Sequence, residues 1–262
     1  MKIHQSQLRT LYRCGEQYRR RYVEGEKIPP SVAAITGTAT HASVELNLRH
    51  KIETGGLLEP DVVRDAARDK LVSAWDAGVL LDADESAKGE GIVKAAALDT
   101  AVALAGCHHE SLAPIIQPVN VERYFEVDLA GYCTLAGTID VEEKTRVRDT
   151  KTAGKAPSQA DADTSEQLTV YSLARRIEGT LPGDVCLDAL VKTAKPKAVT
   201  IHSTRTDADL EMQLRRIEVA VDVIDRGIFL PTDPSNWWCS VRFCGYHSTC
   251  RYAKRPVTKA VP

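Results

Sequence analysis

The 262-residue sequence has few aromatic residues, only two methionines and no marked excess of charge of either sign. Its formal net charge is -2, so no global basic field indicates a nucleic-acid-binding protein. No apolar run approaches the roughly 20 residues that a membrane-spanning helix needs. The first residues, MKIHQSQLRT, lack the apolar core of a signal peptide. We therefore expect one large domain without a membrane segment, in the cytoplasm of a bacterium or a phage-infected host.

A disulfide framework is also not indicated, because the seven cysteines are an odd number in a protein expected to be cytosolic. Three of them, Cys239, Cys244 and Cys250, lie close together in WWCSVRFCGYHSTC, and three thiolates need a fourth ligand. The chain has no C-x2-C pair, which zinc sites usually contain, although His247 would complete a Cys3His zinc site. Of the four other cysteines, we expect Cys107, Cys133 and Cys186 to be buried thiols.

Hydrophobic periodicity predicts helices and strands that alternate after a helical first part. A basic helix over 6–24 begins at Ser6, and a second helix begins at Thr38 or Thr40. Further helices are expected over 60–76, 86–111, 162–178 and 207–226, and strands over 119–129, 184–192 and 198–204. This order predicts an α/β layer fold with a helical N-terminal insertion. Within one domain over 1–262, we expect a basic helix (1–30), a helical region (31–115), the core (116–230) and a cysteine-rich segment (231–262).

The segment Gly137–Lys151, GTIDVEEKTRVRDTK, is typical of two strands folded back on each other at Lys144–Thr145. Such a turn places Asp140 opposite Asp149, and two carboxylates on one face repel unless a divalent cation lies between them. Lys151 points to the same face as Asp149 because side chains alternate along a strand. The group fits a metal site for phosphodiester hydrolysis. Without support from other residues, a surface ion pair would be the better interpretation.

Two helical pairs could complete this site. His41 and Glu45 are one turn apart, and an imidazole beside two carboxylates suits Mn²⁺ better than Mg²⁺, which also stays possible. Gln167 and Tyr171 are likewise one turn apart and could contact a nucleotide backbone. The alternatives are a capping or core role for His41, a capping box from Thr164 to Gln167, and simple packing of Tyr171.

Taken in order, these motifs resemble the RecB-like branch of the PD-(D/E)xK nuclease superfamily. The likeness is greatest to its iron–sulfur members: CRISPR-associated RecB-like exonucleases, the AddB nuclease domain and related phage exonucleases. It spans Cys14 to Cys250 and includes Gly37-x-x-x-His41, Gly137-Thr-Ile-Asp140, Asp149-Thr-Lys151, Gln167-x-x-x-Tyr171 and the final cysteines. The first gap between those cysteines is two residues longer than in the family's C-x2-C-x5-C pattern.

The resemblance implies a restriction-endonuclease-like mixed sheet flanked by helices, with a C-terminal cysteine segment. It implies a metal-dependent DNA exonuclease that acts on single strands or DNA ends, in recombination, repair or CRISPR-type processing. Its Mn²⁺ or Mg²⁺ would be bound by His41, Asp140, Asp149 and the Thr150 carbonyl, with Lys151 as the catalytic lysine and Gln167 and Tyr171 as the accompanying pair. Cys14 would join Cys239, Cys244 and Cys250 around a [4Fe–4S] cluster, structural Zn²⁺ being the alternative.

No helicase-type phosphate loop is present, so unwinding would require a helicase or recombination partner. A different class of function also fits the sequence. The protein could be a DNA-end-binding recombination or assembly protein whose nuclease site is vestigial.

Overall fold

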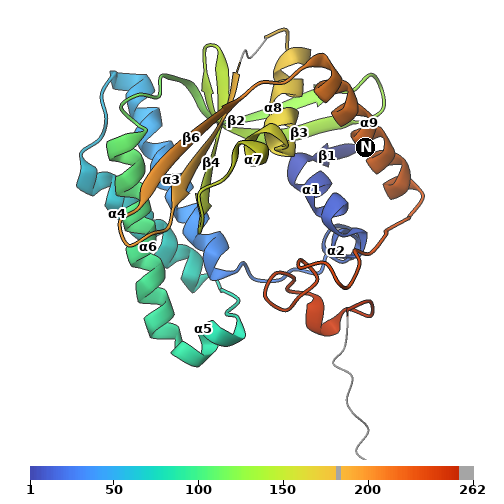
Figure 1. Cartoon of the computed structure of the whole chain (residues 1–262), viewed down its shortest axis with the longest axis horizontal. Coiled ribbons are helices and arrows are strands. Elements are labelled where there is room, and N and C mark those ends of the chain that lie inside the picture. Colours follow the sequence, from blue (N-terminus) through green and yellow to red (C-terminus); the bar gives the residue numbers. More distant parts are fainter. Residues whose placement is uncertain (181–183, 254–262) are drawn as a thin grey trace, which may run out of the picture.

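The computed structural model describes residues 1–180 and 184–253. Its centre is a six-stranded mixed sheet in the order β1-β3-β4-β5-β6 (Figure 1). The strand β2 pairs with β3 along the edge opposite to the one that β1 and β4 share. The β1–β3 and β4–β5 pairs are parallel, and the other pairs are antiparallel. The strands are β1 (Lys2–His4), β2 (Pro118–Asp128), β3 (Thr134–Glu143), β4 (Arg146–Ala153), β5 (Asp184–Val191) and β6 (Lys197–Ser203). The expected mixed α/β architecture is confirmed, although the short strand β1 was not predicted.

Helices cover the sheet and extend it on one side. They are α1 (Gln5–Arg13), α2 (Gly15–Tyr18), a π-helical turn (Arg19–Val23), α3 (Val32–Thr54), α4 (Pro60–Asp76), α5 (Ala83–Lys88), α6 (Glu90–Ser111), α7 (Gln159–Asp163), α8 (Glu166–Ile177) and α9 (Asp207–Asp225). One core joins the sheet to α1, α8 and α9, and a second lies between α3, α4 and α6. A third connects α3 and α6 to the sheet, so the helical region is packed against the core.

Helix α6 corrects the expectation about apolar runs. By length and composition alone it could cross a membrane, with a mean hydropathy of 1.2 over its most apolar window. However, its buried residues Val93, Ala97 and Ala101 pack in the core shared with α3 and α4. The helix therefore serves as a central packing element of the helical region.

The N-terminal helix differs from its prediction at both its start and its middle. It begins at Gln5 with His4 as N-cap, instead of at Ser6, because the Gln7 side chain accepts the His4 backbone N–H at 2.7 Å. At Cys14 the backbone is extended (φ -164°), and α1 ends there. The next N–H, that of Gly15, donates to the Leu230 carbonyl at 2.8 Å. A contact with the distant C-terminal segment thus replaces a helical hydrogen bond.

Three other helix boundaries were predicted wrongly. Helix α3 is capped by Ser31, and Thr38 and Thr40 lie inside it with their hydroxyls bonded to carbonyls four residues earlier. Gly89 (φ +91°) separates α5 from α6. The expected helix over 162–178 is divided into α7 and α8, and Ser165 caps α8 in place of Thr164. The helix over 60–76 and the C-terminal strands agree with their predictions.

The hairpin of β3 and β4 has the predicted register, since Val141 pairs with Arg148. The backbone pairing ends at Val141 and Arg148. The expected pairing of Asp140 with Asp149 is therefore not part of the strand ladder. The strands β1 and β4 share one edge of β3. Along that edge β1 pairs with Thr134–Ala136 and β4 pairs from Val141 onward, so the residues between these two stretches pair with neither strand. The Asp140 carboxylate uses this space, where its Oδ2 accepts the Thr150 backbone N–H at 3.0 Å.

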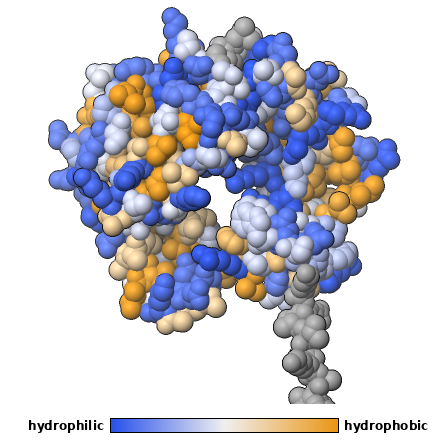
Figure 2. Space-filling model, viewed as in Figure 1, coloured by the Kyte–Doolittle hydropathy of each residue, from blue (hydrophilic) through white to orange (hydrophobic). Residues whose placement is uncertain are grey.

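The C-terminal segment closes the molecule into a ring. At one end, a Cβ atom on Gly15 would lie 2.6 Å from the Leu230 backbone nitrogen, so only glycine permits this approach. At the other end, a Cβ atom on Gly245 would lie 2.8 Å from the Ile28 side chain, just before α3. Figure 2 shows a central opening, and Figure 1 places the start of α3, the end of β4 and the C-terminal segment around it.

Candidate active site and cysteine cavity

Asp140 and Asp149 lie at the two ends of one hydrogen-bonded chain of side chains. Lys151 Nζ donates to Asp149 Oδ1 at 2.7 Å and to Gln167 Oε1 at 3.0 Å. Gln167 Nε2 donates to Tyr171 Oη at 2.5 Å, and Tyr171 Oη donates to Asp140 Oδ1 at 3.2 Å. The structure therefore brings together the hairpin acids, the lysine and the helical pair that the sequence singled out.

Local structure explains how the chain of contacts is built. Asp149 and Lys151 are two apart on β4 and share one face, whereas Gln167 and Tyr171 are one turn apart on α8 and share another. Tyr171 is 1% exposed and packs edge-on against Phe125. Only glycine fits at position 137, because a Cβ atom there would lie 2.8 Å from the Phe125 ring. Residues of the hydrophobic core thus fix the position of the phenol beside Asp140.

Burial controls the protonation of these groups. Burial raises the pKa of Asp149 to about 6, with the Asp140 charge adding to the rise and Lys151 opposing it. Burial also raises the pKa of Tyr171 well above its ordinary value, and the charges of both aspartates add to this, so the phenol stays a proton donor. Within the described residues, Asp149 Oδ2 is buried and has no hydrogen-bond partner. A buried carboxylate oxygen without a partner is energetically costly, and a cation would satisfy it.

A second set of ligands faces Asp140 from the other side. His41 Nδ1, on α3, lies 3.5 Å from Asp140 Oδ2 and 3.9 Å from Glu122 Oε1. Burial by itself would lower the pKa of His41, but Glu122 and Asp140 outweigh it and raise the pKa. Ligand atoms of His41, Glu122 and Asp140 all lie within 4.8 Å of one another, which is close enough to hold one metal ion.

Glu122 was missed by the sequence interpretation. It belongs to the expected strand, but it is placed beside Asp140 only by the β2–β3 register, in which Val121 pairs with Val141 and Arg123 with Ile139. Its backbone has φ +48°, a left-handed conformation that is costly for a residue with a Cβ atom. Strain of this kind, of order 1–3 kcal/mol, is concentrated at functional sites. No motif in the sequence indicates it.

Two expected participants have different surroundings. Glu45 does not join His41; it forms an ion pair with Arg49 at 2.8 Å near the protein surface. Thr150 is buried, and its backbone N–H holds Asp140. Ligation by the Thr150 carbonyl stays a prediction.

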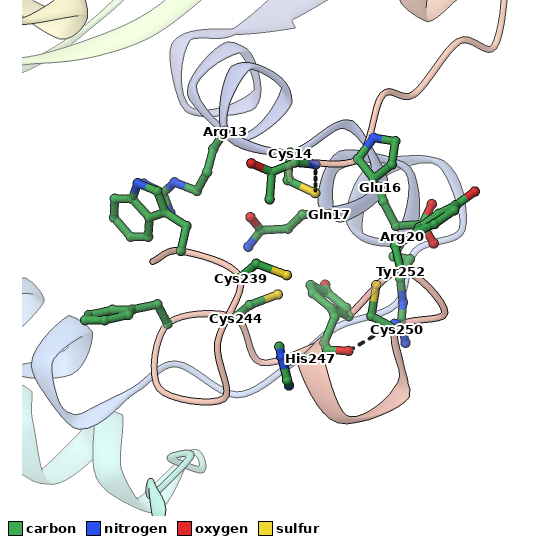
Figure 3. A pocket seen from close by; sticks show the side chains of 15 residues that line it. Arg13, Cys14, Glu16, Gln17, Arg20, Cys239, Cys244, His247, Cys250 and Tyr252 are labelled. Carbon is green, nitrogen blue, oxygen red and sulfur yellow. Dashed lines mark hydrogen bonds between the residues drawn. The ribbon is translucent and has the colours of Figure 1, made fainter. Parts of the chain in front are cut away.

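Four cysteines line a single cavity next to the N-terminal helix. Cys14 comes from the break between α1 and α2, and Cys239, Cys244 and Cys250 come from the C-terminal segment. Figure 3 shows their sulfur atoms pointing into a common space. Burial raises the pKa of the Cys244 thiol, and the charges of the other three cysteines contribute to this shift. Cys133 and Cys186, expected to be simple buried thiols, are buried elsewhere, and Cys107 is half-buried.

Four thiolates are a ligand set that can hold either a structural Zn²⁺ or a [4Fe–4S] cluster.

Comparisons with known proteins bear on the family and the fold. The family model of the PD-(D/E)XK nuclease superfamily matches residues 3–251. Among solved structures, the chain is similar to a protein from Eubacterium rectale described as a "putative exonuclease", with 12% sequence identity and a TM-score of 0.60 over 99% of this chain and 94% of that chain. This similarity confirms the restriction-endonuclease-like fold. None of the curated proteins matches the chain.

Proposed function

This chain belongs to the PD-(D/E)XK nuclease superfamily, and from that premise we propose that it is a metal-dependent DNA exonuclease that acts on single strands or DNA ends. The observation that supports this most is the chain of hydrogen bonds from Asp149 through Lys151, Gln167 and Tyr171 to Asp140. It joins two acids and a lysine, the groups that phosphodiester hydrolysis requires, at a point next to the His41 imidazole.

The residues present fit a divalent cation. Asp140, Asp149 and His41 are the proposed ligands, together with the Thr150 carbonyl, and the unpartnered Asp149 Oδ2 supports this set. Glu122 joins them because its carboxylate lies within reach of both His41 and Asp140. A site with one imidazole and several carboxylates accepts Mn²⁺ readily and Mg²⁺ as well. When bound, the cation supplies Lewis-acid catalysis, which neutralises phosphate charge and makes water more acidic.

The side chains of the protein then act on the water and the phosphate. Lys151 orients the attacking water and stabilises the charge that develops on the phosphate. Gln167 fixes the lysine, and Tyr171 holds one oxygen of Asp140 so that the other faces the site. The water oxygen gives up a proton to solvent and forms the new bond to phosphorus, the bond to the 3′-oxygen breaks, and that oxygen takes a proton from solvent. The products are a 5′-phosphate and a 3′-hydroxyl.

For the cysteine cavity we propose a [4Fe–4S] cluster bound by Cys14, Cys239, Cys244 and Cys250, as in the iron–sulfur branch of the superfamily. The four thiols that both ends of the chain contribute to one cavity support a bound cluster, and structural Zn²⁺ is the alternative. Its role would be to fasten the N-terminal helix to the C-terminal segment. Visible absorbance and iron and zinc analysis of anaerobically purified protein distinguish the two.

The setting that fits such an enzyme is the cytoplasm, in recombination, repair or CRISPR-type DNA processing. Since the sequence contains no helicase-type phosphate loop, a partner would supply any unwinding.

The decisive experiment incubates the purified protein with end-labelled single-stranded and duplex DNA and either Mn²⁺ or Mg²⁺. We expect stepwise shortening from an end, and its loss in Lys151→Ala. Lys155→Ala, which changes an exposed lysine four residues further along, is the matched control. Binding of DNA ends without any cleavage would instead support a recombination protein with a vestigial site.

A further inference from the structure

The C-terminal segment carries a compact group of aromatic side chains, which we call the aromatic patch: Trp237, Trp238 and Phe243. The two indoles stack with ring centres 3.9 Å apart and planes 25° apart. Phe243 meets both of them edge-on, at 4.9 Å and 5.7 Å. The whole sequence has only three tryptophans and three phenylalanines, so half of them are gathered here.

Covering the cysteine cavity does not account for the patch. Trp238 and Phe243 line that cavity, but Trp237 is 58% exposed and Phe243 is 45% exposed. Val241, between them in the chain, is 69% exposed. Large apolar side chains gathered at a surface indicate a binding site more often than chance exposure.

The charges around the patch indicate the chemistry of the partner. The Arg13 guanidinium lies 3.7 Å from the centre of the Trp238 ring, and that of Arg242 lies 5.6 Å from the Phe243 ring. In the part of the chain that the structure describes, neither guanidinium has a carboxylate within 4 Å. Nearby Arg19 and Arg20, by contrast, are paired with glutamates. The patch therefore combines flat aromatic faces with the exposed positive charge of Arg242 and the half-buried one of Arg13, which also lines the cysteine cavity.

We propose that the aromatic patch is a stacking platform for unpaired bases, with Arg13 and Arg242 next to the phosphates. The proposal rests on the proposed nuclease function and names a determinant of its preference for single strands. An unpaired base presents a free π-face that can extend the Trp237–Trp238 stack, whereas a base within a duplex has both faces covered. A single strand, which is a polyanion with flat and separately exposed rings, matches both features of the patch.

The position of the platform is consistent with this role. The segment that carries it borders the central opening, and the start of α3 and the end of β4 border the opening as well (Figures 1 and 2). Lys151 is near the end of β4, and His41 is in the first half of α3. A strand held on the platform can therefore continue through open space toward the candidate active site.

The test measures binding of a fluorescein-labelled oligodeoxythymidine and of a blunt duplex, in a Lys151→Ala background so that neither is cut. We expect Trp237→Ala combined with Phe243→Ala to weaken binding of the single strand about tenfold or more and to leave duplex binding unchanged. Trp237→Phe combined with Phe243→Ala should regain most of the single-strand affinity that the double alanine variant loses, because an aromatic ring is retained at position 237. Tyr132→Ala, which removes another aromatic side chain that is 55% exposed, is the control.

Two results would overturn the platform: single-strand affinity equal to the parent, or an equal loss for single strand and duplex. Iron content and visible absorbance are measured on every variant, so that damage to the cysteine cavity is recognised. The two proposals fail separately, as cleavage by proteins that keep Lys151 shows. If the protein with an unchanged patch binds the single strand through the patch but cuts no DNA, the nuclease proposal is refuted. If the double variant binds and cuts as that protein does, only the platform proposal is refuted.

Discussion

The candidate active site and the cysteine cavity hold their potential ligands in different ways. In the active site, hydrogen bonds already link Asp149, Lys151, Gln167, Tyr171 and Asp140, and the hydrophobic core fixes the phenol. In the cavity, the cysteines come from the two ends of the chain. The contacts that position Cys14 include the Thr232 N–H, which donates to Cys14 Sγ at 3.4 Å, and the Gly15–Leu230 backbone bond.

On the two proposals above, hydrogen bonds within the protein arrange the active site, whereas the proposed cluster would secure the cysteine cavity. Loss of a cation from the active site should abolish chemistry and leave the fold intact. Loss of the group in the cavity should release the C-terminal segment and open the ring. The predictions for Cys14, Asp140 and Glu122 test this contrast, and the prediction for His108 tests the helical region.

The largest effect is expected from Cys14→Ala. A cluster that connects Cys14 to the C-terminal cysteines would close a loop of more than 200 residues, and by the loop-entropy relation for cross-links it would stabilise the fold by about 5 kcal/mol. We expect the variant to lose iron and to unfold at lower urea concentration. Cys107→Ala, at a half-buried cysteine outside the cavity, should keep both properties. A brown Cys14→Ala protein with unchanged urea resistance is the result that excludes Cys14 as a ligand.

Asp140→Asn should act on the chemistry alone. The amide keeps the size of the side chain and can still accept the Thr150 N–H, but it removes one negative charge that holds the cation. We expect cleavage to fall about 10³-fold, as for the loss of a main electrostatic group, with unchanged visible absorbance and urea unfolding. Glu45→Gln, one helical turn from His41 and paired with Arg49, should cleave like the parent. If Asp140→Asn cleaves normally, the metal site is elsewhere.

His108 tests whether the helical region behind the active site resists acid. Burial lowers the pKa of His108 to about 3, with His41 contributing, whereas an unfolded histidine titrates near 6.5. The unfolded chain therefore binds a proton that the folded chain refuses, and stability falls as the pH drops below 6.5. We expect a loss of roughly 2 kcal/mol between pH 7 and pH 5 that is absent in His108→Leu. If urea titrations show the same loss of stability on acidification for the unchanged protein and for His108→Leu, buried neutral His108 is not the source of the acid sensitivity.

The smallest effect is expected from Glu122→Gln. Its carboxylate is one of several around the proposed cation, so its loss should raise the Mn²⁺ concentration for half-maximal cleavage about tenfold without changing the rate at saturation. The measurement is a metal titration of cleavage. A rate that falls at every metal concentration would instead assign Glu122 a direct part in the chemistry.

The hairpin shows how far sequence patterns lead. Alternation around Lys144–Thr145 predicts the Val141–Arg148 register, because a one-residue slip would reverse every side chain. Periodicity likewise predicts α4, α9 and the last two strands. The helix starts at His4 and Ser31 were missed, since several capping residues compete within a few positions and tertiary contacts choose between them.

Local sequence by itself determined the residue types of the site: the acids and lysine of the hairpin, the Gln167–Tyr171 pair and the cysteines at the two ends. Their spacing along single elements sets which of them share a face, because strand and helix periods are fixed by the backbone. Tertiary structure decided what these groups meet. Glu122 reaches His41 only through the pairing of β2 with β3, and Cys14 reaches the final cysteines only because Gly15 lets the C-terminal segment approach the N-terminal helix. Both contacts join residues far apart in the chain, and no local pattern encodes such a distance.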